Sequence, residues 1–167
     1  MEAGKAIEAR RSIRKYQPAD VPQEHIRSML EAAMRAPSAC NTRPWEFFVI
    51  RDAALKRRLA AVSPYCRQVV QAPVCIVVCG RPDLQEAVCS PYWQQDCGAA
   101  IENLLLAAVD LGYGTCWCGL YPSAGRAEAV EEILGCQGIP IALITVGVPD
   151  EVPPPRKELP LERIHYM

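Results

Sequence analysis

The side chains with the clearest chemical potential are three arginines and a serine close to the N-terminus. Arg10, Arg11, Ser12 and Arg14 fall within five consecutive residues, directly after a short stretch that favours a helix. A guanidinium group offers a planar fork of N–H donors that pairs with two oxygens at once, which suits a phosphate. Taken alone, such a segment is more often a solvent-exposed basic turn. Its functional interpretation therefore needs support from other parts of the chain.

A second segment, residues 36–45 (APSACNTRPW), follows one helix length later and ends where an apolar strand is expected. Pro37, Ser38 and Asn41 favour turns, and their side chains and exposed backbone can hydrogen-bond a polar ring or a sugar alcohol. The simpler interpretation is a helix end followed by a strand, with Trp45 in the core. Each segment is weak evidence alone, but the two in this order and spacing favour a ligand site.

A third segment, residues 111–119 (LGYGTCWCG), follows a long apolar helix candidate. Its glycines would let the backbone approach a flat ring closely. It does not match the dinucleotide-binding fingerprint, because the glycine spacing differs and a strand follows instead of a helix. Cys116 and Cys118 lack a C-x-x-C partner and the chain holds only two histidines, so zinc is not expected. A cysteine nucleophile would need a base that nothing nearby supplies, so we expect both to be core residues.

The last candidate lies beyond the proline-rich residues 149–155 (PDEVPPP), which predict an extended connector. Arg156 and Lys157 follow this connector. A charged tail is the simpler interpretation of the pair. The functional interpretation is one more phosphate partner, which returns from the far end of the chain.

Apolar patterning predicts the elements that must position these segments. Helices are expected at residues 2–9, 22–35, 52–61, 94–111 and 123–134, and strands at 45–50, 74–79, 115–120 and 141–148. Residues 80–95 give no clear prediction. Helices and strands mix without a strict β-α-β alternation, which predicts an α+β fold, and 167 residues suit one domain.

Charge is distributed unevenly along the chain. Residues 1–67 hold 13 Lys and Arg against 7 Asp and Glu, whereas residues 68–167 hold 5 against 12. The net charge is −1, which argues against a nucleic-acid partner. A basic N-terminal part suits an anionic ligand.

The N-terminus shows no apolar leader, and no stretch is long and apolar enough to span a bilayer, so no membrane partner is expected. Nine cysteines are present, an odd number without C-x-x-C spacing, and most lie in apolar strands or helices. Free cysteine behaves in such places as a small buried hydrophobe. We therefore expect a protein of the reducing cytoplasm.

Taken in order, these segments resemble the signature of the nitroreductase family. Its members typically show R-R-S-[IV]-R, then A-P-S-A-x-N-x-Q-P-W, a long apolar helix, L-G-L-G-T-C-W and a C-terminal R-K-P-like element. The resemblance covers nearly the whole chain. One departure is Arg43, which stands where the family usually has Gln.

The resemblance implies one α+β domain, residues 1–167, with a central mixed or antiparallel sheet flanked by helices. It implies an intertwined homodimer in which a C-terminal arm, about residues 150–167, is exchanged with the partner subunit. FMN would be the cofactor and NAD(P)H the co-substrate. The expected activity is ping-pong hydride transfer to a small electrophilic acceptor such as a nitroaromatic or a quinone. The flavin carries the chemistry, so no side chain is assigned a catalytic role and no metal is expected.

The resemblance also assigns cofactor contacts residue by residue, in four groups. The groups are Arg10, Arg11, Ser12 and Arg14 on the phosphate and the pyrimidine edge; Pro37, Ser38, Ala39 and Asn41 from the partner subunit; Cys116, Trp117, Cys118 and Gly119 behind the ring; and Arg156 on the phosphate. Three other functions stay open at this point. They are a flavin-binding redox sensor or store without turnover, a specialised relative such as a reductive dehalogenase or a flavin-degrading enzyme, and a cysteine-rich metal protein.

Overall fold

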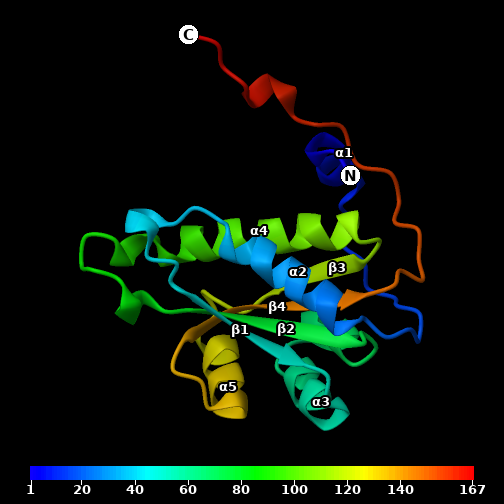
Figure 1. Cartoon of the computed structure of the whole chain (residues 1–167), viewed down its shortest axis with the longest axis horizontal. Coiled ribbons are helices and arrows are strands. Elements are labelled where there is room, and N and C mark those ends of the chain that lie inside the picture. Colours follow the sequence, from blue (N-terminus) through cyan, green and yellow to red (C-terminus); the bar gives the residue numbers. More distant parts are fainter.

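The computed structural model describes all 167 residues and is built on one four-stranded antiparallel sheet (Figure 1). Its strands are β1 (Trp45–Ile50), β2 (Val74–Gly80), β3 (Gly114–Gly119) and β4 (Ile139–Gly147), in the order β1-β2-β4-β3. The central strands β2 and β4 are buried at almost every position, which explains their continuous apolar sequences. Strands β1 and β3 form the two opposite edges.

Helices cover both faces of the sheet (Figure 1). One face carries α2 (Gln23–Met34) and the long helix α4 (Trp93–Asp110). The other face carries α3 (Ala53–Ala61) and α5 (Ala124–Leu134). The short helix α1 (Ala3–Ala9) packs on α4 from outside. The α+β fold with a helix-flanked antiparallel sheet is therefore confirmed.

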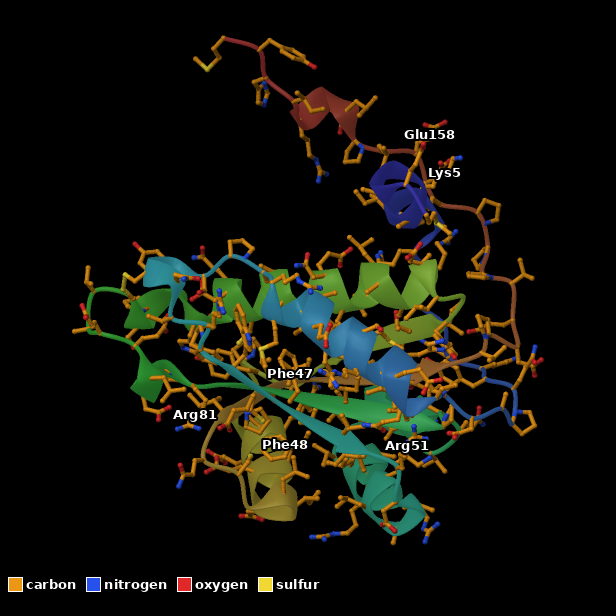
Figure 2. All side chains as sticks on the ribbon, in the orientation of Figure 1. Lys5, Phe47, Phe48, Arg51, Arg81 and Glu158 are labelled. Atoms are coloured by element: carbon orange, nitrogen blue, oxygen red, sulfur yellow. A yellow bond between two sulfur atoms is a disulfide. The ribbon has the colours of Figure 1, made fainter.

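The two faces of the sheet bury different side chains. Phe47 and Phe48 follow one another on β1 and pack on opposite faces, as the period of a strand requires (Figure 2). The α2–α4 face has a core of 21 buried residues that includes one cysteine, Cys97. The α3–α5 face has a core of 12 buried residues, and five of them are cysteines. The expectation that most cysteines are small core residues is thus confirmed for this face.

Helices and strands begin and end within two residues of the predicted positions. The sequence did not predict the five short 3-10 helices. Two lie at Ala39–Asn41 and Leu161–Arg163. The other three lie between α3 and α4, at Pro64–Val69, Pro82–Leu84 and Ser90–Tyr92. The first of them follows α3 and folds back towards β4. None of the helices combines the length and the apolar character needed to cross a bilayer.

The N-terminal arginine segment runs along the free edge of β3. Ser12 forms an isolated parallel bridge with Thr115, and the Ile13 N–H donates to the Thr115 carbonyl at 2.8 Å. Ile13 packs so closely on Gly114 that a Cβ there would lie 2.6 Å from the Ile13 side chain. Glycine at position 114 therefore allows the close approach of this segment to β3.

The C-terminal arm leaves β4, passes α1 and extends away from the rest of the molecule (Figure 1). Arg156 Nη2 donates to the carbonyl oxygen of Ile7 at 2.9 Å, which ties the arm to α1. Lys5 and Glu158 lie near each other where the two segments meet (Figure 2). Beyond this point the arm exposes several apolar side chains, namely Leu159, Leu161, Ile164, Tyr166 and Met167.

Candidate functional site

A pocket of about 510 Å³ lies at the β3 edge of the sheet. Its volume falls within the usual range for small-molecule sites. Four parts of the chain line it, namely Arg14, the 3-10 helix Pro64–Val69, strand β3 and helix α5. The lining residues are Arg14, Pro64, Tyr65, Gln68, Cys116, Trp117, Cys118, Gly119 and Arg126.

The pocket is electropositive. Arg14 and Arg126 are its only charged lining residues, and none of the nine is acidic. The Arg126 guanidinium carbon lies 5.4 Å from the centroid of the Tyr65 ring, within the range of a cation–π contact. Two cations and aromatic walls suit a flat anionic ligand.

Backbone contacts fix the position of Arg14. Its N–H and that of Lys15 both donate to Glu151 Oε1, which lies at the base of the C-terminal arm. Tyr16 is buried, and its hydroxyl donates to the Ile13 carbonyl and lies 2.6 Å from Thr145 Oγ1. Burial raises the pKa of Tyr16, so its hydroxyl keeps its proton and can donate. The turn that carries Arg14 is therefore anchored to β4.

Two thiols and an amide form part of the pocket wall. Gln68 Nε2 lies 2.9 Å from Cys118 Sγ and 3.5 Å from Cys116 Sγ. The neighbouring Cys118 thiol and the charge of Arg14 lower the pKa of Cys116, although burial acts in the opposite direction. The neighbouring Cys116 raises the pKa of Cys118, so Cys118 keeps its proton.

Of the predicted N-terminal contacts, only Arg14 lines this pocket. Arg10 Nε lies 3.3 Å from Glu102 Oε1 on α4, and the Arg10 carbonyl accepts a hydrogen bond from Arg156. Arg11 donates to the Pro154 carbonyl and lines a second hollow of about 350 Å³. Arg156 does return to the arginine segment, but it contacts backbone oxygens there.

The segment that contains Pro37, Ser38, Ala39 and Asn41 lies elsewhere in the same chain. The Ala39 N–H donates to Asp96 Oδ1 at 3.0 Å, at the start of α4. The segment leads directly into β1, and three inter-strand steps of about 4.8 Å separate β1 from β3, about 14 Å in all. It also lies on the α4 side of the sheet, whereas Cys116 and Cys118 belong to the α3–α5 core.

A disulfide joins Cys40 in this segment to Cys89 in the loop before α4. The expectation that the cysteines are reduced is therefore wrong for this pair. Cys40, Asn41 and Arg43 also adopt left-handed backbone conformations, with φ of 52°, 54° and 51°. Such conformations cost on the order of 1–3 kcal/mol each in non-glycine residues and persist only where the surroundings hold them.

A buried carboxylate holds the same two segments together. Besides the Ala39 N–H, Asp96 accepts a hydrogen bond from Gln85 Nε2 at 3.0 Å. The Gln85 amide also donates to Thr42 Oγ1 at 2.9 Å. The strained turn is thus fixed by one covalent bond and by hydrogen bonds through one side-chain amide.

Sequence reasoning missed the residues that complete the pocket opposite β3, namely Pro64, Tyr65, Gln68 and Arg126. None belongs to a recognisable motif, and Gln68 and Arg126 come from different elements. One signal was available. Ser63 and Pro64 mark a turn after α3, and the Ser63 side chain indeed accepts a hydrogen bond from the Tyr65 N–H.

Comparison with known proteins gives a consistent result. A sequence model described as the nitroreductase family matches residues 7–68 and 64–148. A Methanothermobacter thermautotrophicus protein, provisionally named an NADH dehydrogenase/NAD(P)H nitroreductase, is 41% identical over 99% of this chain and 86% of its own length.

Two solved structures are similar over almost the whole chain. A Clostridium difficile R20291 structure described as an FMN-dependent nitroreductase has a TM-score of 0.88 and 26% identity, and the match covers 96% of both chains. A nitroreductase-type protein of Desulfovibrio desulfuricans in complex with FMN has a TM-score of 0.85 and 31% identity, over 100% of this chain and 97% of that chain.

The fold and these matches define a nitroreductase-type oxidoreductase. The chain belongs to the nitroreductase family. The family, the fold and the enzyme class that the motifs predicted are thereby confirmed.

Proposed function

We propose that this protein is an FMN-dependent oxidoreductase that passes a hydride from NAD(P)H to a small electrophilic acceptor, such as a nitroaromatic or a quinone. Two observations support the cofactor. Similar structures are described as FMN-dependent or contain FMN. The pocket beside Arg14 has the volume and the positive charge for a flat anionic ligand. This pocket is the observation that carries the proposal.

The residues present fit a flavin. A Cβ added to Gly119 would meet nothing within 4 Å, so a ring can approach the β3 backbone there. Trp117 also lines the pocket, and its side chain is partly exposed. Arg14 offers N–H donors and positive charge, and the Gln68 amide is a further polar group in the wall.

Bound FMN would supply the hydride chemistry, and the protein would bind and orient it. The Arg14 guanidinium would stabilise negative charge at the polar edge of the ring system. The Tyr65–Arg126 pair would form the opposite wall and limit which acceptors enter. Because donor and acceptor would use one open face in turn, the kinetics would be ping-pong. The lack of a dinucleotide-binding fingerprint supports one shared site.

We further propose a homodimer in which each flavin is held by both subunits. Arg14, Cys116–Gly119 and the arginine segment would come from one subunit. Pro37, Ser38, Ala39 and Asn41 would come from the partner, because they lie far from the pocket in their own chain. The exposed apolar residues of the C-terminal arm would pack on the partner subunit, which supports an exchanged arm.

The absorption spectrum and the released cofactor test the proposal. The purified protein should be yellow, and mass spectrometry of the supernatant after denaturation should show FMN. Double-reciprocal plots of NAD(P)H oxidation at several fixed quinone concentrations should be parallel. Release of FAD, or of no flavin after reconstitution, would overturn the cofactor assignment. Intersecting plots would overturn the shared site, and flavin binding without NAD(P)H oxidation would favour a sensor or store.

A further inference from the structure

A hollow of about 380 Å³ lies beside the pocket, and the proposed function makes no use of it. Arg14 and Gln68 line both, so this adjacent hollow borders the pocket directly. The 3-10 helix Pro64–Val69 supplies Gln68 and also Arg67, which lines the adjacent hollow alone. A ligand too long for the pocket would therefore extend into the adjacent hollow. Its lining residues are Arg14, Lys15, Arg67, Gln68, Gln71 and Glu151.

The adjacent hollow has an excess of positive charge. Arg14, Lys15 and Arg67 are cations, and Glu151 is the one acidic lining residue. None of the three cations forms an ion pair with a carboxylate. Glu151 instead accepts hydrogen bonds from the backbone N–H groups of Arg14 and Lys15. The excess of two positive charges matches a phosphate monoester, which carries about −1.5 to −2 charges at pH 7.

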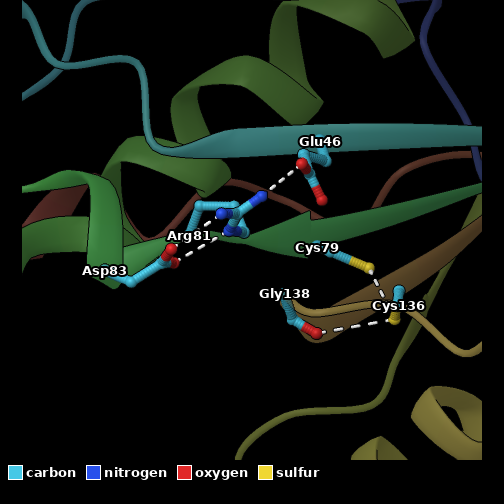
Figure 3. Close-up of polar contacts among 6 residues, drawn as sticks. All are labelled: Glu46, Cys79, Arg81, Asp83, Cys136 and Gly138. Atoms are coloured by element: carbon cyan, nitrogen blue, oxygen red, sulfur yellow. Dashed lines mark hydrogen bonds and ion pairs between the residues drawn. The ribbon is translucent and has the colours of Figure 1, made fainter.

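Arg81 provides an internal contrast, because its charge is already neutralised within the protein. Its guanidinium group is paired with Glu46 on β1 and with Asp83 in the 3-10 helix Pro82–Leu84 (Figure 3). Arg67 is exposed and has no such carboxylate partner. Arg81 therefore joins segments of the chain, whereas the N–H donors of Arg67 are available to an anion from solvent.

We propose that the adjacent hollow binds the 2′-phosphate of NADPH, so that the protein prefers NADPH to NADH as its hydride donor. This inference rests on the proposed function, because the nicotinamide ring must reach a flavin in the pocket. The two donors differ only in the 2′-phosphate, and arginine is the residue that commonly accepts it. Arg67 and Lys15 would contact the phosphate. Arg14, which lines both hollows, would lie between the phosphate and the flavin ring.

FMN also carries a phosphate, but two observations favour the donor as the ligand of the adjacent hollow. Its three cations are all exposed, as a ligand that must leave at every turnover requires. A permanently bound phosphate is often held by backbone N–H groups. Those of Arg14 and Lys15 are already bonded to Glu151. The adjacent hollow therefore suits an exchanging co-substrate better than a resident cofactor.

The first test measures binding without turnover. Adenosine 2′,5′-bisphosphate and adenosine 5′-monophosphate, which differ only in the 2′-phosphate, are titrated into the purified full-length protein by calorimetry. We expect the bisphosphate to bind about five- to tenfold more tightly. Arg67→Gln should abolish this difference. The matched variant Arg58→Gln, which alters an exposed arginine of α3 outside the adjacent hollow, should retain it.

The second test compares the two donors in steady-state kinetics. Arg67→Gln should lower the ratio of kcat/KM for NADPH to kcat/KM for NADH by the same factor, mainly through a higher KM for NADPH. Arg58→Gln should leave this ratio unchanged. Added salt should lower the ratio in the unaltered protein, because ions screen interactions between exposed charges.

Equal affinity for the two nucleotides, or a donor ratio that Arg67→Gln does not change, would overturn the inference. Titration with FMN and riboflavin distinguishes the other source of phosphate. If Arg67→Gln weakens FMN but not riboflavin and leaves the donor ratio unchanged, the adjacent hollow holds the flavin phosphate and the inference is wrong. Binding of the bisphosphate through Arg67 in a protein that takes up no flavin would support the subsite and overturn the proposed function. Oxidation of both donors with equal kcat/KM would support the proposed function and overturn the subsite.

Discussion

The segments on either side of helix α2 both predict a ligand site from the sequence, but the fold places them in different surroundings. The preceding segment, residues 10–14, lies along β3 and directs Arg14 into an electropositive pocket. The following segment, residues 36–43, lies at the β1 edge, where a disulfide and Asp96 hold a left-handed turn. Motifs that predict one ligand site can therefore lie too far apart in one chain to form it.

The backbone of the two segments is also held in place in different ways. Around Arg14 the backbone is held by hydrogen bonds and by close packing of Ile13 on Gly114. Around Asn41 it is held by the covalent bond between Cys40 and Cys89. The conformation of residues 10–14 should thus depend on packing and charge. The conformation of residues 36–43 should depend on whether the Cys40–Cys89 disulfide is intact.

Removal of the C-terminal arm should have the largest effect, because the arm would hold the two subunits together. Without it, residues 10–14 of one subunit would no longer lie beside residues 36–43 of its partner. Deletion of residues 153–167 should convert the dimer to a monomer in sedimentation velocity and abolish stoichiometric FMN binding. Lys157→Ala, which keeps the apolar side chains of the arm, should remain dimeric. A truncated protein that stays dimeric with bound FMN would show that the arm does not complete the site.

Loss of the Cys40–Cys89 disulfide should have the next largest effect, a loss of stability that comes from residues 36–43. A covalent link between residues 49 apart is worth about 2–4 kcal/mol of stability. Cys40→Ser should lower the free energy of unfolding in urea by this amount, and reduction of the unaltered protein should reproduce the loss. Cys136→Ser serves as the control. Equal stability of Cys40→Ser and the unaltered protein would show that Asp96 holds the turn without the disulfide.

Loss of charge in the pocket should weaken cofactor binding without a comparable loss of stability. A charge-assisted hydrogen bond contributes about 1.5–3 kcal/mol, so Arg14→Ala should raise the dissociation constant for FMN about tenfold or more. Arg57→Ala, which removes an exposed arginine of α3, should leave it unchanged. Flavin fluorescence titration measures both. Equal affinity of the two variants would remove Arg14 from the site.

Two glycines of β3 should give the smallest and most local effects. Gly114→Ala would push Ile13 away, since the new Cβ would lie 2.6 Å from its side chain, and should cost about 1–3 kcal/mol of stability. At Gly119 the new Cβ would lie in open space, so the stability should stay unchanged. The added methyl group should nevertheless weaken FMN binding. Thermal unfolding and FMN titration of both variants would reveal the contrast. The reverse pattern would contradict the placement of the arginine segment.

The elements of the fold were predictable because apolar periodicity and turn residues are local signals. The strands β2 and β4 are continuous apolar runs, and α4 shows a clear apolar stripe. Arg14 and Cys116–Gly119 were named from two sequence motifs, and the fold brings both motifs to the same pocket.

The rest of the site depends on tertiary folding. Gln68 and Arg126 meet β3 only because a 3-10 helix and α5 fold back on it, and neither has a distinguishing neighbour in the sequence. The pairing of Cys40 with Cys89 depends on the loop before α4, which has no regular pattern. Left-handed backbone at Cys40 is likewise not a property of the residue type.

The most direct test of the shared site is FMN binding by a mixed dimer of two defective subunits. One subunit carries Arg14→Ala, the other carries Asn41→Ala, and differently tagged chains are purified together. If each site takes Arg14 from one subunit and Asn41 from its partner, one of the two sites in the mixed dimer is intact. We predict one FMN per dimer at the affinity of the unaltered protein, with both homodimers weakened. A mixed dimer that has no site of unaltered affinity would contradict a site shared between subunits.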